Sequence, residues 1–272
     1  MKSYLKKVEE ILKAEPDPAF ARRARIIFAN LELKNGQKIL DVGCGRGFYL
    51  KTLAALGLKL NLHGIDLNQK YLDVAQRIVK KPVHLTKAEA TNLPFRKNSF
   101  DRIIASEILE HIPNDEKAIS EIYRVLRPNG IAMITVPNKN YPFFWDPLNW
   151  SLERLFNWHL PSNIWWLAGL WADHLRLYEK KELGKKLKKA GFKIKKTWNT
   201  THYCFPFSHF LLYGIGKNLV EKGFFKSFNR FESQTKSFLL DKLLLSPLRQ
   251  FDGFNKDCSS FSSVNIVLKL RK

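Results

Sequence analysis

The stretch ILDVGCGRG, residues 39–47, joins a buried strand to a glycine-rich turn. The apolar run over 38–42 is typical of a strand that is covered on both faces of a parallel sheet. Gly43, Gly45 and Gly47 follow at once, and glycine is needed where the backbone turns tightly or approaches a ligand closely. A helix is expected to begin after this turn, so its free N–H groups and positive end would face a bound ligand.

Strands and helices alternate on both sides of this turn. Strands are predicted at 38–42, 62–66, 83–85, 101–106, 131–136, 192–198 and 264–270. Helices are predicted at 3–13, 18–31, from the glycine turn to Leu56, from Asn68 to about Lys80, from Asn114 or Asp115 to Leu126, and at 178–190, with a turn at 127–130. This alternation predicts βαβ units and a parallel sheet in an α/β protein.

Asp66 is predicted to end the second strand, 25 residues after Asp41. An acid at this place in a dinucleotide-binding fold accepts hydrogen bonds from ribose hydroxyls. The dinucleotide pattern G-x-G-x-x-G is not met, because Phe48 takes its sixth position and the spacing is G-x-G-x-G instead. The alternative for Asp66 is an acid that only stabilises the start of a helix through the helix dipole.

A longer series of motifs resembles the class I S-adenosylmethionine-dependent methyltransferases, a family that includes enzymes of the ubiquinone and menaquinone pathways. The matching motifs are DVGCGRG (41–47), GIDLN (64–68), AEATNLPFRKNSFDRIIASEILEHI (88–112) and IYRVLRPNGIAMITVPN (122–138). The resemblance is close over 36–138 and looser over 174–198. It implies a Rossmann-like three-layer sandwich whose mostly parallel seven-stranded sheet has an antiparallel last strand. It also implies S-adenosyl-L-methionine as the cosubstrate.

The same resemblance assigns the glycine turn to the methionine end of the cosubstrate. By position, Gly43, Cys44, Gly45 and Gly47 are expected to lie against the methionine moiety and the ribose. Asp41 is expected to anchor the turn and the amino group of that moiety.

The adenosine end is assigned in the same way. Asp66 is expected to bind the ribose hydroxyls, and Leu67 to pack on the adenine. Glu89 takes the place of an acid that meets the adenine amino group, with a solvated surface acid as the alternative, and Ala90 offers its backbone N–H. Ser106 is expected to face the reactive end of the cosubstrate.

The candidate catalytic residues are Glu107, Glu110 and His111, which form the pattern E-x-x-E-H. Methyl transfer depends mainly on positioning, and a base is needed only when the acceptor must lose a proton. The pattern resembles the catechol-type O-methyltransferases of ubiquinone synthesis, in which such acids and histidine bind a divalent metal. In other members the histidine caps or packs, and we assign no metal ligand here. His174 is expected to be structural or to contact the substrate.

Three segments outside the core are expected to form a helical cap over the acceptor pocket. They are residues 1–35, 139–176 and 203–262, while the core comprises 36–138, 177–202 and the last strand within 263–272. The two insertions are rich in aromatic residues, among them Trp145, Trp150, Trp158, Trp165, Trp166, Trp171 and the phenylalanines of 205–231, with lysines interleaved. These aromatics predict an apolar tunnel or membrane-facing surface, a nucleic-acid platform, or simply a small core of the cap.

Composition and charge indicate more about the cellular location of the protein than about its substrate. The net charge of +21 suits an anionic membrane surface, nucleic acid or an acidic substrate, or reflects solvated charges only. Three dispersed cysteines give no disulfide framework or zinc motif. The charged N-terminus is not a signal peptide, and no apolar stretch is long enough to span a membrane. We expect a cytoplasmic protein, either free or peripherally attached to a membrane.

Three functions follow from these observations. The first is O- or C-methylation of a hydrophobic or lipid-linked small molecule. The second is methylation of RNA or protein through the basic surface, although no RNA-binding module is visible. The third is a non-catalytic protein that binds S-adenosylmethionine.

Overall fold

The computed structural model describes residues 3–13, 15–161, 164, 168–212, 250, 252–255 and 262–272. Its strands are β1 (Lys38–Val42), β2 (Asn61–Asp66), β3 (Val83–Lys87), β4 (Phe100–Ser106), β5 (Leu126–Pro137), β6 (Lys193–Thr200) and β7 (Asn265–Arg271). Its α-helices are α1 (Ser3–Leu12), α2 (Pro18–Asn30), α3 (Phe48–Ala55), α4 (Gln69–Ile78), α5 (Asp115–Val125), α6 (Pro147–Phe156) and α7 (Lys180–Lys189). Three short 3-10 helices are η1 (Leu109–His111), η2 (Phe143–Trp145) and η3 (Gly169–Trp171).

The seven strands form one sheet in the order β3-β2-β1-β4-β5-β7-β6. All neighbouring pairs from β3 to β5 are parallel, and β7 is antiparallel to both β5 and β6. The predicted sheet, with its antiparallel last strand, is therefore confirmed. The chain leaves β1 toward β2 and returns to β4 on the other side, which is where open α/β sheets form a ligand crevice.

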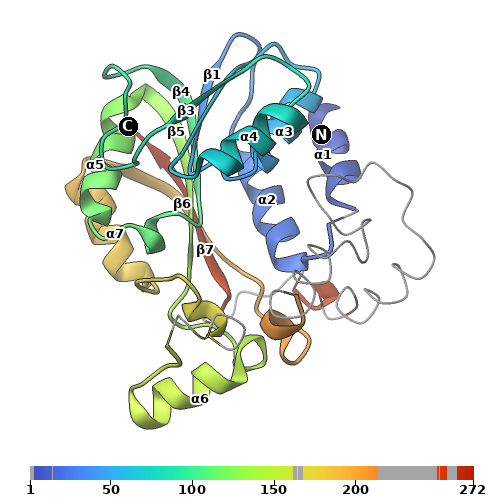
Figure 1. Cartoon of the computed structure of the whole chain (residues 1–272), viewed down its shortest axis with the longest axis vertical. Helices are drawn as coiled ribbons and strands as arrows, with labels where there is room; N and C mark the ends of the chain where they lie inside the picture. Colours follow the sequence, from blue (N-terminus) through green and yellow to red (C-terminus); the bar gives the residue numbers. More distant parts are fainter. Residues whose placement is uncertain are drawn as a thin grey trace.

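Helices cover both faces of the sheet. Figure 1 shows α1 to α4 on one face and α5 with α7 on the other. Successive residues of β1 point to opposite faces of the sheet. Ile39 therefore packs in the core under α1 to α4, and Leu40 packs in the core under α5 and α7. The apolar residues of the run over 38–42 are thus buried on both faces of the sheet, as expected.

The predicted helix starts are confirmed by their caps. The Asn68 side chain accepts hydrogen bonds from the backbone of Lys70 and Tyr71, and the Asn114 side chain accepts one from Lys117. These bonds satisfy N–H groups that have no partner within the helix.

The segment over 127–130 differs from the expected turn. It belongs to β5, which begins at Leu126 opposite Phe100. The register shifts between Phe100 and Arg102, and Asn129 has a left-handed φ of 62°. Asn tolerates this conformation better than most residues, so the sequence RPNG forms an irregular stretch of β5 that interrupts the pairing with β4, which resumes at Ile131.

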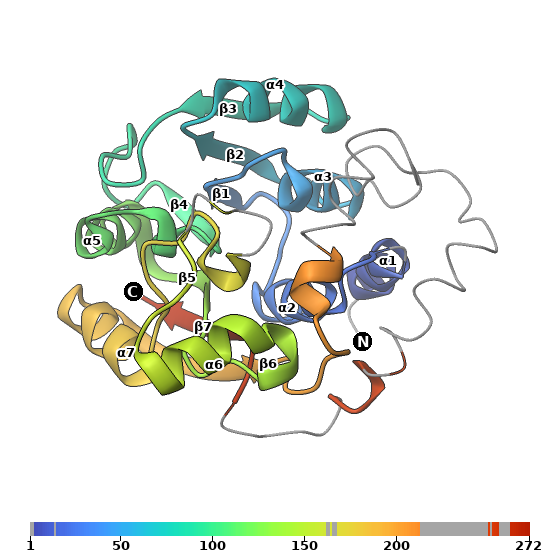
Figure 2. The same cartoon turned by 60° about the horizontal axis from the view of Figure 1, so that its bottom comes forward.

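The segment that follows β5 contains the helix α6, whose position the sequence pattern did not give. Asp146 caps α6 through a hydrogen bond from the Asn149 backbone, and Pro147 takes the first helical position. Tyr141, Trp145, Leu170 and neighbouring residues form a small separate core (the cap core) with Ala19 of α2. Figures 1 and 2 show α6 beyond the end of the sheet at which β5 ends. Trp165, Trp166 and the aromatics of 213–231 lie outside the described residues.

In the part of the chain that the structure describes, none of the helices has the length and apolar character that crossing a membrane requires.

Candidate active site

The carboxyl ends of β1, β2 and β4 bring the predicted site residues to one edge of the sheet. Asp41 lies near the end of β1, Asp66 ends β2, and Ser106 ends β4. Because β1 pairs in parallel with both β2 and β4, these ends are adjacent. The structure therefore brings together residues that lie 65 positions apart in the chain.

The glycine turn is held against the end of β2 by its own backbone. The Cys44 N–H donates to the Ile65 carbonyl at 2.8 Å, and the Gly45 N–H donates to Oδ2 of Asp66 at 2.8 Å. Gly43 has a φ of 70°, and a Cβ there would stand 2.7 Å from the Ile108 side chain. The Cys44 thiol is buried, which raises its pKa, so only its backbone is available to a ligand.

Asp41 is a buried carboxyl group with an unsatisfied oxygen. Its Oδ2 has no hydrogen-bond donor among the described residues, and the side chain is almost fully buried. Burial, and then the nearby charge of Asp66, raise the pKa of Asp41 to about 8. An orphaned acceptor in this position is suited to a cationic donor such as an ammonium group.

The end of β2 offers a different surface. Oδ1 of Asp66 accepts the Asn68 N–H at 2.8 Å, so each carboxylate oxygen holds one backbone bond and keeps capacity for another donor. Leu67 is 60% exposed, although leucine normally avoids water. Glu89 is exposed and accepts the Thr91 hydroxyl, and Ala90 is half-buried.

Glu107 is held by side chains from two other strands. Its Oε1 accepts the Thr135 hydroxyl and its Oε2 accepts the Asn265 amide, both at 2.8 Å. The Ser106 hydroxyl bonds Thr135 at 2.9 Å and the Tyr49 hydroxyl at 3.0 Å. Glu107 also has a φ of 52°, a conformation that costs energy for a residue other than glycine. These bonds make Glu107 part of a fixed network at the end of β4.

Arg23 of α2 completes this network. It donates to the Asn265 side chain at 3.0 Å and lies 3.9 Å from Oε2 of Glu107. Four members of this network were not predicted from the sequence, namely Tyr49, Thr135, Asn265 and Arg23. Thr135 could have been predicted, because it lies opposite Ser106 in the parallel register of β4 and β5. Arg23 and Asn265 could not, because they belong to distant segments and no local sequence pattern indicates that these segments approach Glu107.

Glu110, His111 and His174 form a second cluster, in which one ligand atom from each lies within 4.8 Å of the others. Glu110 is fully buried, and neither of its oxygens has a hydrogen-bond partner among the described residues. Nε2 of His111 and Nε2 of His174 lie 4.0 and 3.9 Å from Oε1 of Glu110. Burial, and then the charge of Glu107, raise the pKa of Glu110 well above its usual range.

The two histidines differ in what they can do. Nδ1 of His111 lies 2.7 Å from the Asp173 carbonyl, which can only accept, so the neutral ring carries its hydrogen there and keeps a lone pair on Nε2. His174 is largely buried, and burial followed by repulsion from His111 lowers its pKa to about 3. Two imidazoles and a carboxyl group in this arrangement can hold a divalent metal or pass a proton.

Comparison with known proteins supports the sequence resemblance. Residues 40–134 match the family model described as a methyltransferase domain. The chain is also 31% identical over 197 residues to the uncharacterized protein MJ1252 of Methanocaldococcus jannaschii, a match that covers 70% of this chain and 74% of that protein. The chain belongs to the class I S-adenosylmethionine-dependent methyltransferases. It is thus an enzyme of this family and uses S-adenosylmethionine as its cosubstrate.

Other relatives carry named activities but match over a shorter stretch. A demethylmenaquinone methyltransferase of Lactobacillus johnsonii is 36% identical over 109 residues, and a ubiquinone biosynthesis O-methyltransferase of Azoarcus is 33% identical over 111. These matches cover 38% and 39% of this chain, and 45% and 46% of those two proteins. The chain thus matches less than half of either protein.

Solved structures agree on the fold. A methyltransferase from Mesorhizobium loti has a TM-score of 0.57 at 16% identity and covers 92% of this chain and 97% of its own. The [4+2]-cyclase SpnF has a TM-score of 0.59 at 19% identity and covers 91% and 78%. At these identities the likeness concerns the fold alone.

The residues present fit the cosubstrate of the family. The orphaned Oδ2 of Asp41 suits an ammonium group, and the close approach of Gly43 to Ile108 leaves no room for a side chain in the turn. Exposed Leu67 beside Asp66 offers an apolar face next to a hydroxyl acceptor. Such a pair suits a nucleoside, whose base is apolar on its faces and whose ribose carries hydroxyls.

Proposed function

We propose that the enzyme methylates a hydrophobic or lipid-linked small molecule at oxygen or carbon. The observation that carries this proposal is the cluster of Glu110 and His111 at the edge of the cosubstrate site, closed by His174 from the aromatic cap. The cap core, with Tyr141, Trp145 and Leu170, supports an apolar lining for the acceptor pocket. The named relatives, which act on quinone precursors by their names, support a small-molecule acceptor.

The cosubstrate residues are assigned in the same proposal. Asp41 binds the amino group of the methionine moiety, and the turn that contains Gly43, Cys44, Gly45 and Gly47 lies against that moiety and the ribose. At the other end the ribose and adenine meet the residues already described, namely Asp66, Leu67, Glu89 and Ala90. The cosubstrate supplies a methyl group on a sulfonium, which needs alignment more than activation.

His111 is the residue we propose as the general base for an acceptor hydroxyl. Its Nε2 lone pair is fixed by the hydrogen bond of Nδ1 to the Asp173 carbonyl. The hydroxyl proton moves to Nε2 as the oxygen bonds to the methyl carbon, while the carbon–sulfur bond breaks and sulfur keeps the electron pair. Glu107, held by Thr135 and Asn265, shapes the end of β4 and positions Ser106.

The cap assignment is also a proposal. Residues 139–176, with 1–35 and 203–262, form the cap, and residues 36–138, 177–202 and 263–272 form the core. The small cluster shared by Tyr141, Leu170 and Ala19 supports the part played by the first two segments.

The direct test is formation of S-adenosylhomocysteine from S-adenosylmethionine with polyprenylated catechols and quinols, with unprenylated catechol, and with RNA as acceptors. The proposal requires turnover with an apolar acceptor that is lowered about a hundredfold or more in His111→Ala, within the range for a lost general base. His63→Ala is the matched control, because the His63 ring also packs against a second histidine, His84, while His63 is not among the proposed site residues. Turnover with RNA alone would replace this function by the nucleic-acid one.

A further inference from the structure

The helix α6 turns apolar side chains toward solvent and polar side chains toward the protein, which is the reverse of an ordinary surface helix. Leu148, Leu152 and Leu155 stand at positions i, i+4 and i+7, so they share one face of the helix. Leu155 is 74% exposed and Leu148 is exposed as well, while Leu152 is half-buried. An apolar stripe normally faces the core, but here it faces solvent.

Polar side chains hold the other face of α6 to the protein. The buried Asn149 amide donates to Asp146 at 2.9 Å and to the Ala168 carbonyl at 3.1 Å. Glu153 accepts the Tyr141 hydroxyl and the Trp171 indole N–H. The orientation of the helix is therefore fixed by hydrogen bonds, and the leucines cannot turn inward without breaking them.

The exposed apolar surface continues past the end of the helix. Phe156 is 70% exposed and Trp158 is 50% exposed. Together with the three leucines they form what we call the apolar ridge (Leu148, Leu152, Leu155, Phe156 and Trp158). An exposed apolar surface of this kind marks a site of contact with a protein, a membrane or an apolar ligand.

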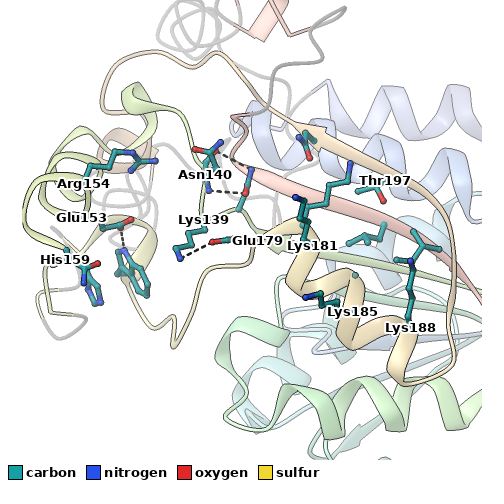
Figure 3. Close-up of a pocket in the computed structure, with 18 of the residues that line it drawn as sticks. Lys139, Asn140, Glu153, Arg154, His159, Glu179, Lys181, Lys185, Lys188 and Thr197 are labelled. Atoms are coloured by element: carbon teal, nitrogen blue, oxygen red, sulfur yellow. Dashed lines mark hydrogen bonds and ion pairs between the residues drawn. The ribbon is translucent and has the colours of Figure 1, made fainter.

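A basic groove lies beside the ridge, between the end of α6 and α7. Its volume is about 1180 Å³, and its lining includes none of the predicted cosubstrate residues. Figure 3 shows Glu153, Arg154 and His159 on the cap side, across from Lys181, Lys185 and Lys188 on α7. Six cations line it, namely Lys139, Arg154, Lys180, Lys181, Lys185 and Lys188, against Glu153 and Glu179.

The groove has a net positive charge because its six cations outnumber its two acids, and both acids already have partners. Glu179 pairs with Lys139 at 3.2 Å, and Glu153 is bonded to Tyr141 and Trp171. Lys181, Lys185 and Lys188 share one face of α7 at i, i+4 and i+7 and are exposed. None of these three lysines pairs with an acid in the described ranges, whereas Lys186 pairs with Asp115 and Glu182.

We infer that the apolar ridge and the three α7 lysines form a docking surface for an anionic lipid bilayer. Leucine and phenylalanine side chains enter the boundary between headgroups and acyl chains, and the lysines meet anionic headgroups in the groove. A nucleic acid would use the cations and Trp158 but would leave Leu148 and Leu155 in water, so the observations favour the bilayer. With ten residues, α6 lies on such a surface and does not cross it.

The inference deepens the proposed function, on which its biological meaning rests, because a lipid-linked acceptor would be met at the bilayer. It is measured without turnover. The 272-residue chain is sedimented with vesicles of phosphatidylcholine alone and with vesicles that also contain phosphatidylglycerol. Wild type should bind the anionic vesicles at least tenfold more strongly.

Two variants and a matched control separate docking from general charge attraction. Leu155→Ser/Phe156→Ser and Lys181→Ala/Lys185→Ala/Lys188→Ala should each lower the affinity for anionic vesicles about tenfold or more. Lys59→Ala/Lys80→Ala/Lys81→Ala makes the same change in net charge on exposed residues away from the groove and should lower it less than twofold.

The folded state of every variant is checked by its affinity for S-adenosylhomocysteine, which should equal that of wild type. The inference is overturned if wild type ignores anionic vesicles, if the two lysine variants behave alike, or if the Leu155/Phe156 variant keeps full affinity. Binding of single-stranded RNA in place of vesicles would overturn it in favour of a nucleic-acid surface. Methyl transfer in solution with no vesicle binding would sink this inference alone and leave the proposed function standing.

Discussion

Asp41→Asn should stabilise the free protein and weaken binding of the cosubstrate at the same time. Asp41 has a pKa of about 8 in the folded chain, mainly because it is buried, against about 3.9 when unfolded. A carboxyl group whose pKa is higher in the folded than in the unfolded state stabilises the protein at low pH. This contribution to stability is lost as the pH rises from the unfolded-state pKa to the folded-state pKa. The neutral asparagine avoids that loss.

The magnitude follows from the two pKa values. At pH 7 the folded protein keeps this proton and the unfolded chain has released it, which lowers the free energy of unfolding by roughly 4 kcal/mol relative to acidic solution. A buried amide without partners costs about 1–3 kcal/mol in return. Asp41→Asn should therefore gain roughly 1–3 kcal/mol at pH 7 in urea denaturation. Near pH 4 the carboxyl is protonated in the folded protein at little cost, so the variant should lose about 1–3 kcal/mol there, the cost of its buried amide.

Binding should change in the other direction. An ammonium group beside Asp41 favours the ionised carboxyl, so wild type should release a proton on binding S-adenosylhomocysteine near pH 7. Calorimetry in buffers of different ionisation enthalpy measures that proton. Asp41→Asn should release none and bind about 10- to 100-fold more weakly, the range for a lost charge-assisted hydrogen bond. Equal affinity, together with equal pH dependence of stability, would refute the reasoning.

Three further predictions concern the turn and the histidine cluster. Gly43→Ala should abolish binding of S-adenosylhomocysteine, because its Cβ would stand 2.7 Å from Ile108. Gly36→Ala is the control, because Gly36 also has a positive φ but has open space around it, and this variant should keep binding. Calorimetry measures the affinity of both variants. Because burial raises the pKa of Glu110, the stability of wild type should decline as the pH rises above about 4.3. Glu110→Gln should remove this decline. Thermal melts of both proteins across pH check this, and an unchanged pH profile in the variant would contradict it. Melts of wild type with and without a chelator should coincide if Glu110 is simply protonated, whereas a chelator-sensitive melt would mean that Glu110, His111 and His174 hold a metal ion.

Much of the fold could be predicted from sequence because its signals are local. The run over 38–42 and the caps Asn68 and Asn114 depend on neighbouring residues only, so the positions of strands and helix starts were predicted closely. The position of α6 could not be predicted, because its outward leucines and inward Asn149 invert the usual pattern of a surface helix.

The site was predictable only to the extent that the strand ends define it. Asp41, Asp66 and Ser106 follow from strand ends that meet in a parallel sheet. The bonds of Glu107 to Asn265, and the approach of His174 to Glu110, join segments 158 and 64 residues apart. Such contacts arise from tertiary packing, which residue spacing does not report.

The central claim is that the glycine turn and Asp66 hold the cosubstrate, and a calorimetric titration with S-adenosylhomocysteine tests it most directly. Wild type should bind at micromolar concentration, Asp66→Ala should lose binding while keeping its thermal stability, and Asp73→Ala, an exposed acid on α4, should bind as wild type does. Undiminished binding by Asp66→Ala would contradict the account.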